Sequence, residues 1–356
     1  MRTRWVALLT PVVLLLAAPW LLAEEAAATR PRNITLFGWD GAQREHVMEC
    51  LEKGELPTLK QVASEGKLVK IDIRGTTDTK AGWSQILTGY DPDVTGVYSN
   101  NKYQAVPVGL SIFERLEEHF GKDNFATVAV IGKKGHCGEI DEEKKTEITG
   151  AAAKGKKGAR KDEPGSKIIE EGGKKYRVVP AKPYANMHKA CDVWVFGLEL
   201  DEKVGEKAIE MLDKHKDKPF FFFVHFAQVD HKGHKFGENS KEYNDALISN
   251  DTWTGKIIQK VKDLGLYDKT LVYITADHGF DEDKSGHGNA PRVVLATNDK
   301  LVMRDGDRAD VGPTILERFG VDLSRLQPPL VGVPLTKPVD KPRAQATKGT
   351  KKARRQ

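Results

Sequence analysis

The sequence contains few cysteines, and they form no recognisable metal-binding or disulfide pattern. Cys50, Cys137 and Cys191 are the only three in 356 residues, they lie far apart, and no CxxC pair occurs. A cysteine-rich zinc site or a disulfide scaffold is therefore not indicated, although one disulfide remains open to an exported protein. Beyond residue 23 the chain also lacks an apolar run long enough to cross a bilayer.

The one long apolar run lies at the N-terminus. The basic residues 1–4 precede an apolar stretch over residues 5–23, and three alanines follow at 26–28. This order is typical of a signal peptide, which we predict for residues 1–28, so the protein is expected in the periplasm or outside the cell. A retained membrane anchor is the alternative, because the run is only just long enough to span a bilayer and two prolines interrupt it.

The positive charge of the chain is concentrated at the C-terminus. Residues 337–356 carry eight Lys or Arg and one Asp, a balance of +7, so the other residues must sum to −2 to give the overall +5. Such a composition predicts a disordered basic tail. The tail could make weak contact with an anionic polymer or a membrane surface. No nucleic-acid recognition motif accompanies it, so no specific nucleic-acid recognition is expected.

Strand-like and helix-like segments alternate between residues 29 and 336. The predicted strands cover 33–40, 68–74, 127–132, 219–226, 270–277 and 292–297, and the predicted helices cover 44–53, 57–65, 111–120, 202–215, 240–264 and 310–319. This alternation predicts an α/β fold, with a single large domain in which a mostly parallel central sheet lies between layers of helices.

Residues 133–190 interrupt this pattern. Residues 133–175 are mainly Lys, Glu, Gly and Ala, with too few apolar side chains to fold alone, so the insert is interpreted as a flexible loop, with a lid over the site as one role. The segment 183–197 contains aromatic residues that could stack on a base or an aryl group. Their apolar spacing favours a place in the core.

Three predicted strands lead into acidic residues. Asp40 ends the first, Asp230 lies just beyond residues 219–226, and Asp277 ends the strand at 270–277. Because ligands bind at the carboxyl ends of the strands in open parallel sheets, these acids should gather at one edge. The histidines in the same stretches are His231, His234, His278 and His287. Carboxylate and imidazole groups together indicate a zinc site.

A candidate nucleophile lies in another polar turn. Thr79 follows a predicted strand and precedes a helix, whose N-terminal N–H groups would face an anion. A hydroxyl needs a base or a metal to become nucleophilic at neutral pH. By itself the pattern would make Thr79 or Thr77 an ordinary helix cap.

The ordered set of motifs resembles a known superfamily. Asp40 in GWDG, Thr79 nine residues before Thr88-Gly89, Asp230 followed four residues later by His234, and Asp277-His278-Gly279 occur in sequence. They resemble the alkaline phosphatase superfamily, and within it the type I phosphodiesterase/nucleotide pyrophosphatase branch and its sulfatase-like relatives. The resemblance runs from about residue 33 to residue 319 and implies an alkaline phosphatase-like fold.

The resemblance also implies roles for individual residues. One zinc would be held by Asp40, Asp277, His278 and the Thr79 oxygen, and the other by Asp230, His234 and His287. Asn100 would donate to a phosphoryl oxygen. Two Zn²⁺ ions are implied, and Mn²⁺ or other divalent ions also suit Asp/His sites. His231 is a rival for His287, and His225 is interpreted as a core residue or a partner of a ligand.

The predicted function is metal-dependent hydrolysis of small-molecule phosphate esters, of the phosphodiesterase type, through a phosphothreonine. Lys80 follows Thr79, where the branch usually has an aromatic residue, and it should contact substrate charge or face solvent. A phosphate monoesterase is the first alternative, for which Lys80, Lys102, Lys182 and Lys189 could supply positive charge. Thr79 cannot become formylglycine, which disfavours a sulfatase; a sulfatase or phosphonate hydrolase using threonine, a phosphomutase-like enzyme and a non-catalytic metal-holding protein of the cell envelope remain as alternatives.

Overall fold

The computed structural model describes residues 30–149 and 165–339. The predicted signal peptide, and the predicted basic tail except for residues 337–339, lie outside this part of the chain. Within it, no helix combines the length and the hydropathy that a membrane span requires. All three cysteines are free, so the disulfide that the sequence left open does not form.

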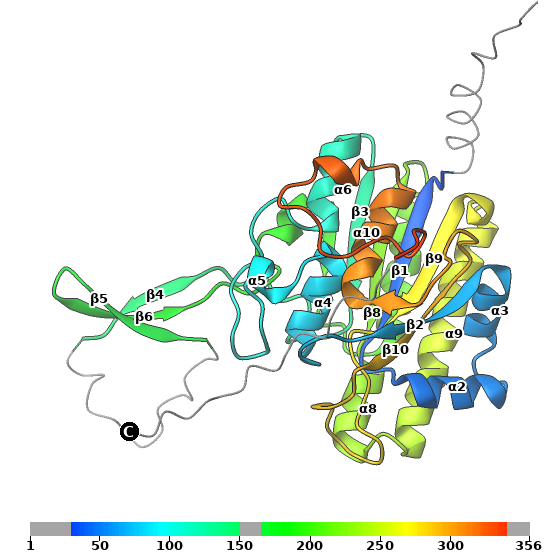
Figure 1. Cartoon of the computed structure of the whole chain (residues 1–356), viewed down its shortest axis with the longest axis horizontal. Coiled ribbons are helices and arrows are strands. Elements are labelled where there is room, and N and C mark those ends of the chain that lie inside the picture. Colours follow the sequence, from blue (N-terminus) through cyan, green and yellow to red (C-terminus); the bar gives the residue numbers. More distant parts are fainter. Residues whose placement is uncertain (1–29, 150–164, 340–356) are drawn as a thin grey trace, which may run out of the picture.

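An eight-stranded sheet forms the centre of the molecule (Figure 1), in the order β11-β2-β10-β9-β1-β8-β3-β7. Its strands are β1 (Asn33–Trp39), β2 (Lys67–Asp72), β3 (Ala126–Ile131), β7 (Val193–Val195), β8 (Phe220–Phe226), β9 (Thr270–Thr275), β10 (Arg292–Thr297) and β11 (Gly306–Asp307). β1 runs parallel to β8 and β9, and β3 runs parallel to β8 and β7. Only β10 among these strands is antiparallel to its neighbours, β2 and β9. The predicted mostly parallel sheet is therefore confirmed.

Helices cover both faces of this sheet. They are α2 (Arg44–Glu52), α3 (Pro57–Glu65), α4 (Thr79–Thr88), α5 (Pro92–Thr95), α6 (Ile112–Phe120), α7 (Asp201–His215), α8 (Gln228–Phe236), α9 (Lys241–Asp263) and α10 (Arg308–Arg318). Successive strand residues point to opposite faces. In β1, Gly38 lies against Trp83 of α4, whereas the Trp39 indole donates a hydrogen bond to Thr254 of α9. The two helices therefore lie on opposite sides of the sheet.

Local sequence signals explain where several helices begin. The Ser240 hydroxyl accepts a hydrogen bond from the Tyr243 amide and caps α9, as the sequence predicted. Ser111 and Glu114 form a reciprocal capping box at the start of α6. Such caps satisfy backbone N–H groups that the helix itself leaves without a partner. The helix that the sequence did not predict is α8, which was interpreted as a loop after the strand at 219–226.

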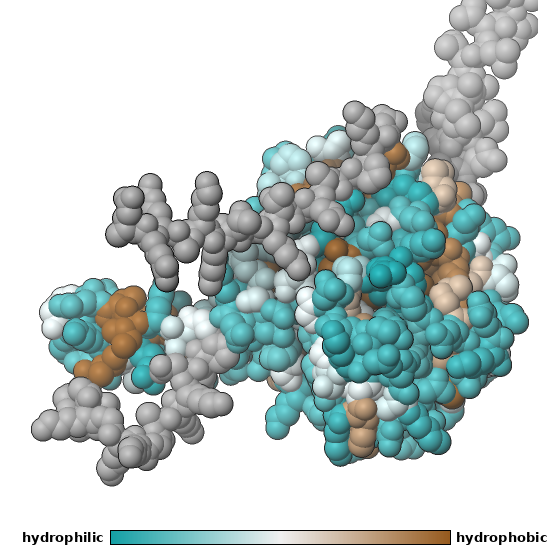
Figure 2. Space-filling view, turned by 60° about the horizontal axis from the view of Figure 1, so that its bottom comes forward, coloured by the Kyte–Doolittle hydropathy of each residue, from teal (hydrophilic) through white to brown (hydrophobic). Residues whose placement is uncertain are grey.

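The insert at 133–190 is not a structureless loop in its described parts. β4 (Lys144–Glu147), β5 (Lys167–Glu171) and β6 (Lys174–Val179) form a separate antiparallel sheet in the order β4-β6-β5. The flexible-loop interpretation is wrong here because backbone pairing and cross-strand ion pairs, such as Lys174 with Glu147, support strands with little apolar surface. The sheet extends outward from the body rather than forming a lid over it (Figure 1). Figure 2 shows an apolar patch on this arm, where Ile168 is 63% exposed.

The end of the insert belongs to the body of the molecule. Tyr184 and Met187 are buried. The ring of Trp194 in β7 lies 5.6 Å from the ring of Phe113 in α6. The expectation that residues 183–197 pack in the core is confirmed, because β7 extends the main sheet beside β3.

A buried ion pair joins α2 to the segment between α8 and α9. His46 Nδ1 lies 2.9 Å from the Glu238 carboxylate, and both side chains are buried. The Glu238 backbone amide donates to the Lys284 carbonyl at 3.0 Å. Burial alone lowers the pKa of His46, but contacts with the Cys50 sulfur and Glu238 raise it to about 10. The pair therefore fixes α2 against the loop that follows β9.

We expect the stabilising effect of His46 to be lost as pH rises. Its pKa is raised from 6.5 to about 10, so the full contribution is present below pH 6.5 and disappears as pH approaches 10. His46→Gln should lower the free energy of unfolding by about 3 kcal/mol near pH 6, because Glu238 loses its partner. The difference from wild type, measured by urea unfolding, should shrink at pH 9.5. His119→Gln, an exposed position on α6, is the control; equal differences for His46→Gln at both pH values would contradict this account.

Candidate active site

The three acids that follow the parallel strands meet at one edge of the sheet. Asp40 follows β1, Asp277 lies two residues beyond β9, and Asp230 lies in the first turn of α8, which follows β8. All three side chains are buried. The register aligns Trp39 of β1 with Phe226 of β8, so these strands end at the same level. The structure thus brings together acids that are up to 237 residues apart in the sequence.

Asp40 is held by groups that contact one of its oxygens. Its Oδ2 accepts a hydrogen bond from the Trp83 indole at 3.1 Å and lies 2.9 Å from His225 Nε2. A Cβ at Gly38 would lie 2.4 Å from a Trp83 ring carbon, so only glycine admits the ring there. His225 is buried and orients Asp40 from the adjacent strand, consistent with one of its two predicted roles.

Thr79 is the first residue of α4. Its Oγ1 lies 3.2 Å from His278 Nε2. The Asn100 side-chain carbonyl accepts from the Lys80 amide at 3.0 Å, and the Asn100 amide donates to Asp78 at 2.9 Å. These bonds use the Asn100 carbonyl oxygen and its backbone N–H, which leaves the side-chain NH₂ as a donor. Asn100 and Thr79 line the same cavity.

A second set of ligand-type side chains lies beside the first. Asp230, His234 and His287 offer ligand atoms that all lie within 4.8 Å of one another. Asp230 and His234 are four residues apart on α8 and therefore share one helix face. His234 Nδ1 contacts the Ser285 carbonyl at 2.9 Å, so the proton is on Nδ1 and Nε2 can accept. His231 is absent from this set and instead lies 3.9 Å from Glu199, so the geometry favours His287 over its rival.

Lys133 is the residue of this centre that sequence reasoning missed. Its Nζ lies 2.8 Å from Asp40 Oδ1, 2.8 Å from Asp230 Oδ2 and 3.2 Å from Thr79 Oγ1. It was assigned to the flexible insert. Lys133 lies two residues after β3, whose parallel neighbour is β8, so its position beyond a predicted parallel strand was the available signal. Burial would lower its pKa, but Asp230, Asp40 and Asp277 raise it, and the ammonium stays charged.

The lysines proposed as substrate contacts lie elsewhere. Lys80 is buried, donates to the Asn100 carbonyl at 3.0 Å and lies 3.8 Å from the Tyr103 ring centroid, so it neither lines the cavity nor faces solvent. Burial lowers its pKa to about 8. Lys182 contacts the Tyr103 hydroxyl, Lys189 pairs with Glu142, and Lys102 lies over Tyr98. These expectations were wrong because neighbouring aromatic and acidic groups bind the lysines.

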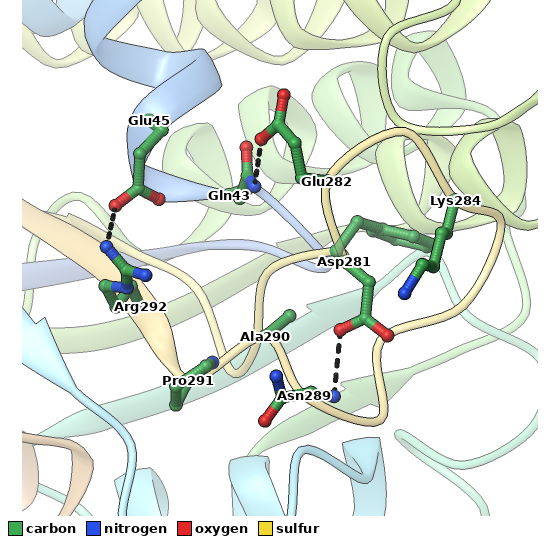
Figure 3. Close-up of a pocket in the computed structure, with 10 residues that line it drawn as sticks. Gln43, Glu45, Asp281, Glu282, Lys284, Asn289, Ala290, Pro291 and Arg292 are labelled. Atoms are coloured by element: carbon green, nitrogen blue, oxygen red, sulfur yellow. Dashed lines mark hydrogen bonds and ion pairs between the residues drawn. The ribbon is translucent and has the colours of Figure 1, made fainter.

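A cavity of about 510 Å³ opens onto the centre. Its lining includes Thr79, Asn100, Lys133, Asp230, His234 and His287, with Lys134, His136, Glu199 and His231 among the others. A second cavity, of about 410 Å³, lies along the loop that carries His287. Figure 3 shows its polar wall, where Asp281 accepts from the Asn289 amide and Arg292 pairs with Glu45. None of the predicted ligands or the nucleophile lines this second cavity.

Residues 35–316 match the family model described as type I phosphodiesterase / nucleotide pyrophosphatase. The chain belongs to this family. The match covers most of the chain and includes every one of the predicted site residues, so the family resemblance read from the motifs is confirmed.

Curated proteins resemble shorter parts of this phosphodiesterase-family chain. A 2,3-bisphosphoglycerate-independent phosphoglycerate mutase from Wolbachia pipientis is 31% identical over 136 residues, which cover 35% of this chain and 24% of that protein. Human arylsulfatase A is 29% identical over 132 residues, covering 35% of this chain and 26% of that protein. The chain therefore matches only about a quarter of the length of each relative.

Solved structures share the fold over a longer range. A protein in the alkaline phosphatase superfamily from Vibrio parahaemolyticus aligns with a TM-score of 0.56 at 18% identity, covering 87% of this chain and 71% of that one. The predicted alkaline phosphatase-like fold is thereby confirmed. The superfamily is metal-dependent, and the test for this chain is whether its buried donor groups fit a metal.

The geometry around His278 fits a tetrahedral metal. Ligand atoms 2.0–2.2 Å from a tetrahedral Zn²⁺ lie roughly 3.3–3.6 Å from one another. The Nε2 atom of His278 lies 3.2 Å from Thr79 Oγ1, 3.5 Å from Asp277 Oδ2 and 3.6 Å from Asp40 Oδ1. His278 Nδ1 contacts the Gly279 carbonyl, so Nε2 carries the lone pair. Burial lowers the pKa of His278 to about 3, which keeps the imidazole neutral and able to ligate.

Asp277 needs a cation that the described side chains do not supply. Neither of its carboxylate oxygens has a hydrogen-bond partner among the described residues, although both are buried. Burial, together with repulsion from Asp40, raises the pKa of Asp277 well above its usual value. A Cβ at Gly82 would lie 2.8 Å from the Asp277 Cβ, so glycine in α4 permits this approach. Arg308 holds the segment by donating to the Asp277 carbonyl at 2.7 Å.

We expect divalent metal to stabilise the fold through these buried carboxylates. Chelation with EDTA should lower the melting temperature by several degrees, because ligand at 100 times its dissociation constant contributes about 2.7 kcal/mol. Asp277→Asn should remove most of this metal-dependent shift in a thermal melt. Asp283→Asn, an exposed acid in the following loop, should retain it. An unchanged shift in Asp277→Asn would argue against a metal at this position.

Proposed function

We propose that the protein hydrolyses phosphate diesters, with Thr79 as the nucleophile and a phosphothreonine as the intermediate. The observation that supports this most directly is the position of the Thr79 hydroxyl. It lies on the wall of a cavity, 3.2 Å from an imidazole and 3.2 Å from an ammonium, with two sets of metal-ligand side chains beside it. A threonine that only capped α4 would have no need of this surrounding, and Asp78 already occupies the cap position.

Each group of the chain has a defined task in this reaction. Asp40, Asp277, His278 and Thr79 would hold one divalent ion, and Asp230, His234 and His287 the other, with Zn²⁺ as the ion that suits these ligands best. Such ions, when bound, supply Lewis-acid charge that lowers the pKa of the hydroxyl and neutralises the leaving oxygen. Thr79 Oγ forms a bond to phosphorus as the ester oxygen leaves, and water then cleaves the phosphothreonine.

Asn100 and α4 supply neutral donors for the phosphoryl oxygens. The Asn100 side-chain NH₂ faces the cavity because its carbonyl is bound to the Lys80 amide. The N-terminus of α4 adds the favourable end of a helix dipole at Thr79. Donors that are fixed before the reaction lower the cost of charge that develops in the transition state.

The charge of the cavity favours a diester over a monoester. A monoester carries an additional negative charge, yet Lys80, Lys102, Lys182 and Lys189 do not line the cavity. Lys133 does, but two carboxylates already contact it. Lys134 is the remaining lysine of the lining and the specific feature that would favour a monoesterase instead. A sulfatase is disfavoured because threonine cannot form formylglycine, although arylsulfatase A is among the similar proteins.

We further propose that the enzyme acts outside the cytoplasm. This rests on the sequence of residues 1–28, in which a basic start, an apolar run and small residues follow one another. The basic residues of the tail would then meet an anionic envelope polymer or lipid surface. Fractionation of cells that express the full chain tests this; recovery only in the cytoplasm would contradict it.

Replacing the nucleophile should abolish turnover. We expect Thr79→Ala to lower kcat on an aryl phosphate diester by at least about a thousandfold, as for other nucleophile deletions. Thr79→Ser should recover activity because it keeps the hydroxyl. Thr76→Ala, in the same turn, is the matched control. Acid quenching of the wild type and mass spectrometry should detect phosphate on Thr79, and near-wild-type turnover by Thr79→Ala would sink the assignment.

A substrate panel separates the proposed reaction from its alternatives. With metal-loaded protein, kcat/KM should be highest for an aryl phosphate diester and lower for the matched monoester and sulfate ester. Asn100→Ala should lower kcat/KM on the diester by about 10- to 1,000-fold, the range for loss of one donor to a developing charge. Faster monoester cleavage would make the protein a monoesterase. Metal binding without any turnover would instead support the non-catalytic alternative.

A further inference from the structure

Lys133 occupies a position between the two predicted ligand sets. Its side chain is only 5% exposed. The ammonium contacts one carboxylate from each set, Asp40 Oδ1 and Asp230 Oδ2, at the same distance of 2.8 Å. It also lies 3.2 Å from the Thr79 hydroxyl. No other described lysine or arginine side chain pairs with either carboxylate.

The backbone fixes this position. The Gly132 amide donates to the His225 carbonyl at 2.8 Å, and the Lys133 carbonyl accepts from the Gly197 amide at 3.2 Å. A Cβ at Gly132 would lie 3.1 Å from the same His225 carbonyl, so the chain passes tightly against β8 just before the lysine. Lys133 is therefore directed into the centre by the sheet itself and not by a surface loop.

Charge explains why an ammonium belongs there in the absence of metal. Asp40, Asp230 and Asp277 are all buried in one cluster, and buried charges without a partner are strongly destabilising. One ammonium can bridge only two of them, and Asp277 is left without a hydrogen bond. Lys133 thus reduces the repulsion of the empty ligand sets without replacing a metal at Asp277.

The same atoms cannot serve both partners. A divalent ion binds carboxylate oxygen at 2.0–2.2 Å, and Asp40 and Asp230 belong to different predicted metal sets. Two dications at these carboxylates would repel an ammonium held between them, unless an anion separates the charges. On the proposed function, that anion is the phosphoryl group attacked by Thr79, whose hydroxyl the ammonium already contacts.

We infer that Lys133 is an exchangeable counter-ion of this centre. Its ammonium bridges Asp40 and Asp230 in the metal-free protein, gives up these carboxylates when metal binds, and then contacts a non-bridging oxygen of the phosphoryl group on Thr79. The first two steps depend only on the ligand residues, whereas the third rests on the proposed function.

Metal affinity and metal-free stability should change in opposite directions in Lys133→Met. Without the ammonium, the melting temperature in EDTA should fall by several degrees, because Asp40 and Asp230 lose their partner. Zn²⁺ binding, measured by calorimetry on the metal-free full chain, should become about tenfold tighter because a competitor is removed. Lys134→Met, which changes the neighbouring cavity lysine, should leave both quantities unchanged.

A structural lysine would behave differently. If Lys133 only packed the site, Lys133→Met would weaken Zn²⁺ binding or leave it unchanged, and either result overturns the proposal. Lys133→Arg keeps the charge and serves if the methionine variant does not fold. It should retain the metal-free stability and bind Zn²⁺ no more tightly than wild type; tighter binding by Lys133→Arg would overturn the competition argument.

Inorganic phosphate tests the contact with the phosphoryl group. With both proteins saturated with Zn²⁺, its inhibition or binding constant should be about tenfold weaker for Lys133→Met than for Lys134→Met, because a charged donor is lost. Equal phosphate affinities would overturn this step. The Zn²⁺ measurements need no turnover, so a protein that cleaves no phosphate ester could still exchange Lys133 for metal, and an active diesterase without tighter Zn²⁺ binding in Lys133→Met would disprove only this inference.

Discussion

The mutual repulsion of Asp40, Asp230 and Asp277 is the constraint on which the site depends. Burying three carboxylates in one cluster is costly unless cations and hydrogen bonds compensate them. Asp40 has Lys133, Trp83 and His225 as partners, and its pKa is therefore held well below its usual value although burial alone would raise it. Asp277 has no comparable partner, and its pKa is raised. The asymmetry leaves an unmet need for positive charge beside Thr79.

The fold sustains this costly arrangement through close backbone contacts. Gly38 admits the Trp83 ring, which in turn donates to Asp40, and Gly82 admits Asp277 against α4. Arg308 is buried and donates to the carbonyls of Asp277 and Thr76. These residues touch the functional side chains from behind, so their role is to fix geometry. A rigid sheet with its strands ending at one level gives them a common reference.

Metal-ligand clusters and a nucleophile could be predicted because they follow directly from the strand pattern. Asp40 and Asp277 come at the ends of apolar runs, and the edge they share is a general property of parallel sheets. The Asp230–His234 spacing is the exception that needed structure, since α8 was interpreted as a loop. Once this segment is helical, the four-residue spacing puts both side chains on one face.

The insert illustrates a different limit. Its composition correctly indicated little capacity to form a core, yet β4 to β6 pair through their backbones, and Ile168 stays exposed. Composition describes side chains, whereas a small antiparallel sheet is built from main-chain hydrogen bonds that any non-proline residue can make. The same reliance on composition hid Lys133 among the other lysines of the segment.

The sequence by itself determined the fold class, the family and the residue types of the centre, because apolar periodicity and the order of motifs are local properties of the chain. Only the tertiary structure decided which charges meet. Lys133 enters the centre while Lys80, Lys102, Lys182 and Lys189 do not, since this depends on which strands are neighbours and on which aromatic and acidic groups are nearer. Coulomb interactions act over a few ångströms in space, and sequence separation carries no information about that distance.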